Sequence, residues 1–280
     1  MIKEVLQTDQ INTDADSSIK GIGLQKIRAA ERLLRALLEN KRAVFCTIEH
    51  VDDVLEVDVE QETTNYTAEQ NKSYSTDFSM NSHEVKNSLR IFFDNWYGTV
   101  EASESIRFVF YTNTNIKKEN KVGVLKDIEE SLPEEPLLQL LCDKKYKEAF
   151  PFVLPIFKKY YLEQHKKHIA NEEDIELYEK ILDSMTEEKW EKFFDLIEWN
   201  FGKPNEIEVR ENVEKSVGEI CLKYGVNQKY ASIVVAQMLD MIESRKFEGD
   251  FLCRIVHVGE IKSLFLEFAQ EAKIQEKLDP

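Results

Sequence analysis

The chain has 280 residues, 42% of them hydrophobic, and it carries 37 basic against 53 acidic side chains, for a formal net charge of −16 at pH 7. A chain of this length favours roughly two domains. The acidic balance argues against a general nucleic-acid coat, because phosphate binding rests on clustered Lys and Arg.

Cysteine usage and apolar runs indicate the compartment. The four cysteines are scattered without CxxC pairs, so the sequence signals neither a disulfide framework nor a structural zinc site. No apolar run approaches the roughly 18 residues of a membrane helix, and the N-terminal stretch lacks the apolar run of a signal peptide. We therefore expect a cytoplasmic protein with no membrane partner.

The first residues divide into a tail and a helix. Residues 1–18 are polar and rich in Asp, Thr and Asn, which predicts a flexible tail. From Ile19 to Leu38, apolar residues recur at spacings of three and four, a pattern typical of an amphipathic helix. Residues 20–42 hold seven basic against two acidic side chains, so a locally basic element lies inside an acidic chain.

Three short runs rich in β-branched residues follow, and each predicts a strand. They lie at residues 42–50, 51–60 and 65–75. Because side chains alternate between the two faces of a strand, Gln70 and Lys72 on the third run point the same way.

A second helix and a fourth strand come next. Asn81 or Ser82 is placed to cap the helix, and the segment from Ile106 to Thr112 has the composition of a strand. The order is therefore helix, strand, strand, strand, helix, strand. After the fourth strand the periodicity is helical, so we expect a domain of mixed structure at residues 19–129 and an all-α assembly or partner domain at residues 130–280.

Five short sequence segments occur along the first part of the chain in this order: GIGLQKIRAAERLL, IEHVDDV, EQNKSY, NSHEVKNSL and IRFVFYTN. Together they resemble the PD-(D/E)xK restriction-endonuclease-like fold. More narrowly, they are similar to the cap-four double-stranded DNA endonucleases, which are effectors of bacterial anti-phage defence. The likeness covers residues 19–119. It implies an αβββαβ core, α+β or α/β in class, followed by the all-α helical domain.

The resemblance also implies a function. The protein would be a metal-dependent endodeoxyribonuclease, a hydrolase that cuts double-stranded DNA with Mg²⁺ or Mn²⁺ in antiviral defence. Activation would come from a sensor or ATPase partner subunit, or from formation of a homo-oligomer. The alternative is a catalytically degenerate scaffold or adaptor of a defence complex. The net negative charge favours it, and so does Gln70, which stands where the family usually has an acid.

The expected catalytic site follows from the chemistry of phosphodiester cleavage, which needs a metal held by hard oxygen ligands. Asp53 is expected to bind the metal directly, with Glu49 as a further ligand. The amide oxygen of Gln70 would also bind it, and the ammonium of Lys72 would stabilise negative charge that develops on the phosphate. Glu69 is an alternative acid beside Gln70, but it points to the opposite face of the strand.

Three residues of the first helix are weaker candidates for DNA contact: Gln25, Arg28 and Arg32. Gln25 matches the first-helix amide of the resembled family, where helix capping or packing is an equal alternative. The two arginines belong to the basic face of the helix, although such a face is more often only solvated.

Overall fold

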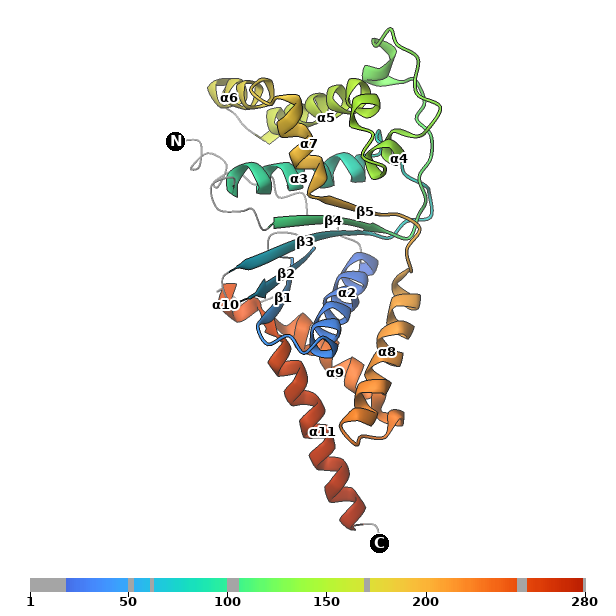
Figure 1. Cartoon of the computed structure of the whole chain (residues 1–280), viewed down its shortest axis with the longest axis vertical. Coiled ribbons are helices and arrows are strands. Elements are labelled where there is room, and N and C mark those ends of the chain that lie inside the picture. The colour runs from blue at the N-terminus through green and yellow to red at the C-terminus, as the bar shows by residue number, and fades with distance from the viewer. Residues whose placement is uncertain are drawn as a thin grey trace. The chain divides into compact units, whose positions relative to one another are not determined.

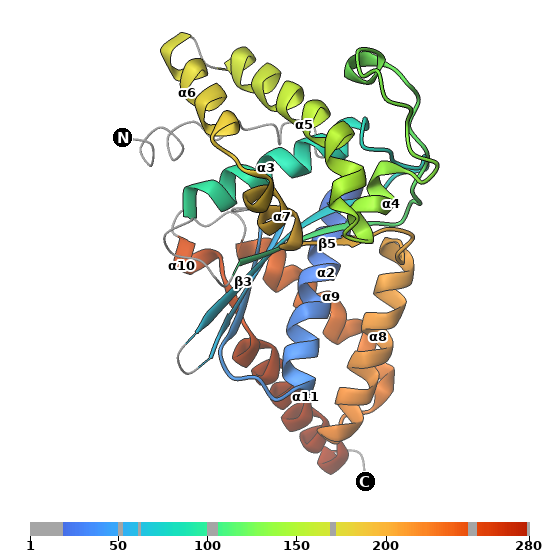
Figure 2. The ribbon, with the colours of Figure 1, turned by 45° about the horizontal axis from the view of Figure 1, so that its top comes forward.

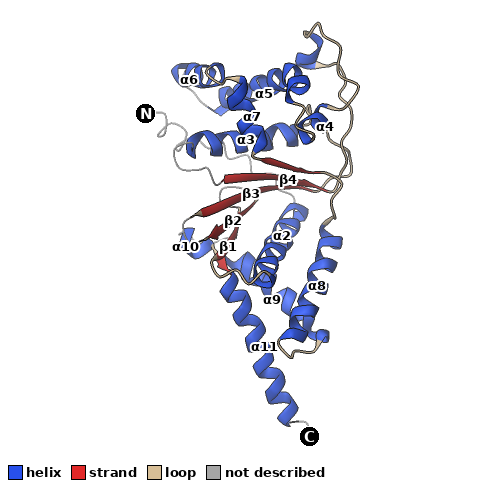
Figure 3. Ribbon diagram, viewed as in Figure 1, coloured by secondary structure: helices blue, strands red, loops and turns tan. Residues whose placement is uncertain are grey.

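The computed structural model describes residues 19–49, 53–60, 63–99, 106–168, 172–245 and 251–278. The predicted tail, residues 1–18, and Asp52 lie outside the described residues. Helices and strands are mixed along the chain (Figure 3). The chain divides into two compact units, of which unit 1 contains Tyr74–Lys203, while unit 2 combines Ser17–Ser73 with Pro204–Pro280.

The first segment of unit 2 contains one helix and three strands: α2 (Ile19–Leu38), β1 (Val44–Ile48), β2 (Val54–Val59) and β3 (Thr64–Lys72). The strands pair antiparallel in chain order, β1 with β2 and β2 with β3. A short strand from the C-terminal segment, β6 (Val256–His257), pairs antiparallel with β1. Strands that are far apart in the sequence therefore share one sheet in this unit.

The remaining helices of unit 2 come from its C-terminal segment. They are α8 (Glu206–Lys223), η3 (Gln228–Tyr230), α9 (Ala231–Arg245), α10 (Phe251–Arg254) and α11 (Val258–Leu278). Helix α2 packs against α8, α9 and α11, and Figure 1 shows α8 beside it. Because its stripe of Leu24, Ile27 and Leu33 is fully buried, α2 is a core helix of this unit.

Unit 1 contains the remaining elements: α3 (His83–Thr99), β4 (Ile106–Thr112), η2 (Gly123–Lys126), α4 (Leu137–Cys142), α5 (Tyr146–His168), α6 (Glu172–Asp183), α7 (Glu187–Asp195) and β5 (Ile197–Asn200). Helix α3 packs against α5 (Figure 2), and β4 pairs parallel with β5. Aromatic side chains fill the core between these helices. The ring of Phe93 lies 5.3 Å from that of Trp190 and 5.6 Å from that of Phe157.

The predicted order of helix, three strands, helix and strand is confirmed, and the fourth strand has the expected bounds. Two features differ. The part predicted to be all-α contains β5 and β6, and the compact units do not divide at residue 130. The physical reason for the second difference is the apolar stripe of α2, which is buried against helices that follow residue 203.

Candidate functional site

The end of β3 brings together three of the predicted site residues, Asp53, Gln70 and Lys72, called here the Asp53 cluster. The register pairs Val54 with Glu69, which places Asp53 opposite Gln70. The Gln70 Nε2 donates to Asp53 Oδ1 at 3.4 Å, and the Lys72 Nζ lies 3.9 Å from Asp53 Oδ2. That same Oδ2 accepts the backbone N–H of Asn71 at 2.7 Å, which fixes the orientation of the carboxylate.

Two other predicted site residues, Glu49 and Gln25, belong to the same unit as the Asp53 cluster. Glu49 directly follows β1, has a left-handed backbone with φ of 51°, and donates its N–H to the carbonyl of Asp53 at 3.2 Å. Gln25 on α2 is 3% exposed, and its Oε1 has no hydrogen-bond partner within the described part of the chain. The predicted roles of both side chains stay predictions.

The Asp53 cluster offers limited support for a metal ion. Mg²⁺ accepts as few as one or two protein carboxylates when phosphate oxygens and water complete its shell. The cluster supplies the carboxylate of Asp53 and the buried amide of Gln70. Across the described residues, no group of three or more His, Cys, Asp or Glu side chains could hold a metal ion. The side chains present therefore fit a cation only if phosphate oxygens of a ligand complete its coordination shell. Binding of Mg²⁺ or Mn²⁺ stays a prediction.

Arg28 and Arg32 are turned toward the sheet, where both bind Glu69 on β3. The guanidinium of Arg28 donates to both carboxylate oxygens of Glu69 at 2.8 Å, and Arg32 forms ion pairs with Glu69 and, at 3.2 Å, with Glu56. The side chain of Glu69 is fully buried, and those of Arg28 and Arg32 are 14% and 7% exposed. Glu69 and Glu56 therefore already engage both guanidinium groups inside the unit, and DNA contact by these arginines stays a prediction.

Glu69 is ionised in this network. Burial alone would raise the pKa of its carboxyl, but the charges and hydrogen bonds of Arg32 and Arg28 outweigh burial and lower the pKa to about 2. The same carboxylate raises the pKa of both guanidinium groups against the opposing effect of burial. The network therefore joins α2 to β3 by charge inside the unit.

A pH dependence of stability follows from this pKa. Because the folded pKa of Glu69 lies below the unfolded value of 4.5, its stabilisation is complete above pH 4.5 and is lost as pH falls toward about 2. We expect this single group to account for about 3 kcal/mol of the loss over that window. Urea unfolding between pH 7 and pH 2 would measure it, and a Glu69→Gln variant should lack this part of the acid dependence. An identical acid dependence in that variant would contradict the assignment.

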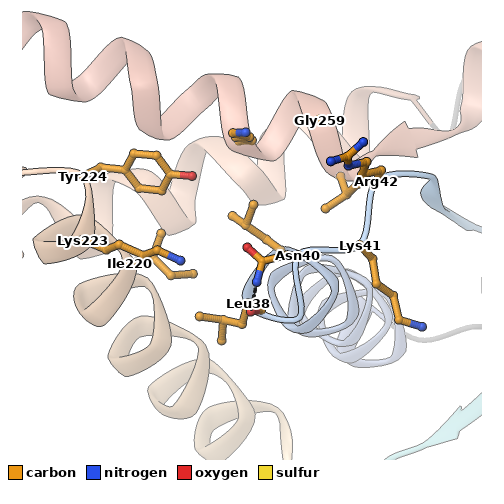
Figure 4. Close-up of a pocket in the computed structure, with 11 residues that line it drawn as sticks. Leu38, Asn40, Lys41, Arg42, Ile220, Lys223, Tyr224 and Gly259 are labelled. Carbon is orange, nitrogen blue, oxygen red and sulfur yellow. Dashed lines mark hydrogen bonds between the residues drawn. The ribbon is translucent and has the colours of Figure 1, made fainter.

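A second feature of unit 2 is a pocket of about 470 Å³ at the ends of α2 and α8 and the start of α11, called here the basic pocket. Its wall carries four cationic side chains, Lys41, Arg42, Lys223 and Lys262. Apolar side chains such as Ile220 and Val258 form its floor. Figure 4 shows how the labelled side chains surround the opening.

The four cations of the basic pocket are not equivalent. Lys41 forms an ion pair with Asp58, and this hydrogen bond raises the pKa of its ammonium group. Figure 4 shows Lys41 extending away from the space near Asn40. By contrast, within the described ranges no ion pair joins Arg42, Lys223 or Lys262 to an acidic group. Three positive charges of the pocket thus have no acidic partner among the residues that the structure describes.

The pocket also has an aromatic wall. Tyr224 lines it, and its ring stacks on the buried ring of Phe265 with centroids 5.9 Å apart and an interplanar angle of 18°. The phenol oxygen points toward the space beside Lys223 (Figure 4). Sequence reasoning missed this site because its residues come from three distant segments and form no linear motif. The excess of basic residues at 20–42, which ends at Arg42, was the single available signal.

Comparison with known proteins yields weak structural matches. Two Acinetobacter baumannii structures are described as Cap4 SAVED/CARF-domain containing receptors with a cyclic trinucleotide. The first, with 3'3'3'-cAAA, is 11% identical with a TM-score of 0.47. The second, with 2'3'3'-cAAA, is 12% identical with a TM-score of 0.48. Each match covers 92% of this chain and 47% of the other, so the chain spans about half the length of these structures.

No known protein family and no curated protein matches the sequence. The comparisons contradict the predicted function, a DNA endonuclease effector: three of the solved structures that match are described as receptors, two of them with a cyclic trinucleotide. Among the helices that the structure describes, none has the length and apolar composition needed to cross a lipid bilayer.

Proposed function

We propose that the protein binds a small anionic ligand of the nucleotide class, carrying phosphate groups and a base, in the basic pocket of unit 2. One observation carries the proposal: Arg42, Lys223 and Lys262 share one pocket and form no ion pair with any acidic residue that the structure describes, in a chain whose net charge is −16. An anion bound in this pocket would be attracted by all three positive charges.

The remaining lining of the pocket suits such a ligand. Guanidinium and ammonium groups are the usual partners of phosphate, Arg as a planar fork and Lys as a point charge. The apolar floor and the ring of Tyr224 provide surface for a base, since aromatic side chains offer stacking area to any nucleobase. The volume, about 470 Å³, lies in the range of roughly 300–1,000 Å³ that small-molecule sites occupy.

Binding of such a ligand would make the protein a sensor component. The side chains that hold the ligand come from the connection between α2 and β1, from α8 and from α11, so a bound anion would tie these three segments of one unit together. If the ligand binds one arrangement of these segments more tightly than another, its binding shifts the protein toward that conformation. A role in antiviral defence stays a prediction.

Isothermal titration calorimetry on the full chain tests the proposal with three probes: inorganic phosphate, AMP and a cyclic triadenylate. We expect the nucleotides to bind and Arg42→Ala or Lys223→Ala to weaken binding about tenfold each, because a hydrogen bond to a charged group contributes about 1.5–3 kcal/mol. Affinity should also fall as NaCl is raised, because exposed charges are screened.

The matched control is Lys215→Ala, which removes an exposed cation from the same helix, α8, away from the pocket. It should leave the affinity unchanged. Absence of heat and of thermal stabilisation with every probe would overturn the proposal. If the Arg42→Ala, Lys223→Ala double variant binds the probes with unchanged affinity, the ligand binds at another site.

A further inference from the structure

Unit 1 contains a pocket of about 370 Å³, called here the Ser/Lys pocket, which is lined by the polar residues Ser79, Asn81, Ser82, Lys117, Lys118 and Asn120 and by the apolar Val122. We propose that it binds a phosphate monoester group. The two segments that form it are held side by side by backbone hydrogen bonds. The N–H of Phe78 donates to the carbonyl of Asn115 at 3.0 Å, and the N–H of Lys117 donates to the carbonyl of Phe78 at 2.8 Å.

The pocket presents donors and cations. Lys117 and Lys118 are exposed, and no ion pair joins either of them to an acidic side chain in the part of the chain described. The Nδ2 of Asn81 is a buried donor that finds no hydrogen-bond partner among the described residues. The Oγ of Ser82 accepts the N–H of Ser79 at 3.0 Å, so its own hydroxyl proton is available to donate.

The buried acid that follows Lys118 in the sequence does not neutralise these groups. Glu119 is 7% exposed, and its two carboxylate oxygens accept backbone N–H groups instead, from Met80 at 2.9 Å and from Leu137 at 2.9 Å. This double hydrogen bond also holds the 78–82 segment against the rest of unit 1. Glu119 therefore shapes the pocket while its charge is satisfied by main-chain donors.

The class of ligand follows from this arrangement. A phosphate monoester has three terminal oxygens, which match hydroxyl, amide and ammonium donors approaching from different directions. Ser82 directly precedes α3, whose N-terminal end carries partial positive charge and adds to the attraction for an anion. Glu84 in the first turn of α3 and Asp77, whose Oδ1 accepts the N–H of Asn115, are acidic groups that oppose binding, so the two lysines must outweigh them.

The test uses the full chain with the basic pocket disabled by Arg42→Ala and Lys223→Ala, so that the two sites are measured separately. Calorimetry with inorganic phosphate and with AMP should still show binding in this background. Adding Lys117→Ala and Lys118→Ala should weaken it by at least about tenfold, because hydrogen bonds from two charged groups to the phosphate are lost. Asn81→Asp, which places a carboxylate where the amide donor stands, should abolish it.

The control in the same segment is Lys121→Ala, because the ammonium of Lys121 donates to the carbonyl of Glu130 at 3.3 Å and the residue does not line the pocket. It should leave phosphate binding unchanged. Circular dichroism shows whether each variant is folded. If Asn81→Asp does not fold, the test rests on the variant that lacks Lys117 and Lys118, because both lysines are exposed. Phosphate binding that survives loss of both lysines would overturn the proposal, as would the absence of phosphate binding in the disabled background. Neither result bears on the basic pocket.

Discussion

Replacing Glu69 with glutamine is expected to lower the free energy of unfolding by about 3–5 kcal/mol at pH 7, the cost of removing one partner from a buried ion pair. The substitution keeps the size of the side chain but leaves the guanidinium groups of Arg28 and Arg32 in the interior without their shared carboxylate. Urea unfolding followed by far-UV circular dichroism would measure the loss.

The matched control is Glu31→Gln. Among the described residues, Glu31 forms an ion pair with Arg28 alone, three residues before it on α2, and its side chain is 37% exposed. Exposed pairs contribute about 0–1 kcal/mol, so this variant should unfold close to the wild type. If the free energy of unfolding falls equally in the two variants, burial of Glu69 does not determine how much its ion pairs stabilise the protein.

Replacing Phe93 with alanine is expected to destabilise unit 1 by about 3–5 kcal/mol, the usual cost of a Phe→Ala change in a core. The ring is fully buried, stacks on Trp190 at 24° and meets Phe157 and Tyr161 edge to face. Its removal deletes packing among several aromatic rings that contact one another, and a void in such a core cannot collapse easily.

Tryptophan fluorescence would measure this change selectively. The chain has three tryptophans, Trp96, Trp190 and Trp199, and all belong to unit 1. The urea midpoint reported by their fluorescence should fall in Phe93→Ala and stay within experimental error in Val122→Ala, a control in the same unit whose side chain is 48% exposed. An unchanged fluorescence midpoint in Phe93→Ala would contradict the role given to this ring.

Local patterns predicted the parts of the structure that depend on neighbours in sequence. The spacing of apolar residues predicted α2, and alternation on β3 placed Gln70 and Lys72 on one face. Asp53 joins them because antiparallel pairing of consecutive strands puts the start of β2 opposite the end of β3. The convergence of these side chains was therefore predictable, although the function drawn from the resemblance was wrong.

Features that depend on distant segments could not be predicted. In the sequence, Arg28 and Arg32 have the pattern of a solvated helix face. Their partner Glu69 lies on β3, far from α2 in the sequence, so local spacing could not indicate the ion pairs. Strand β5 has four residues whose aromatic and apolar spacing also continues the pattern of α7, and its partner β4 is remote in sequence. The basic pocket combines the ends of three helices, which no short motif can indicate.

The discontinuity of unit 2 has a consequence for synthesis of the chain. Helix α2 is made early, while the residues that cover it follow residue 203, and the ion pair of Lys26 with Glu243 joins positions 217 apart in the sequence. At a translation rate of roughly 5–20 residues per second, the apolar stripe of α2 waits for about 10–40 s before its covering helices emerge. During that interval the nascent chain exposes a surface that chaperones recognise, and translation that stops before α8 leaves this surface permanently uncovered.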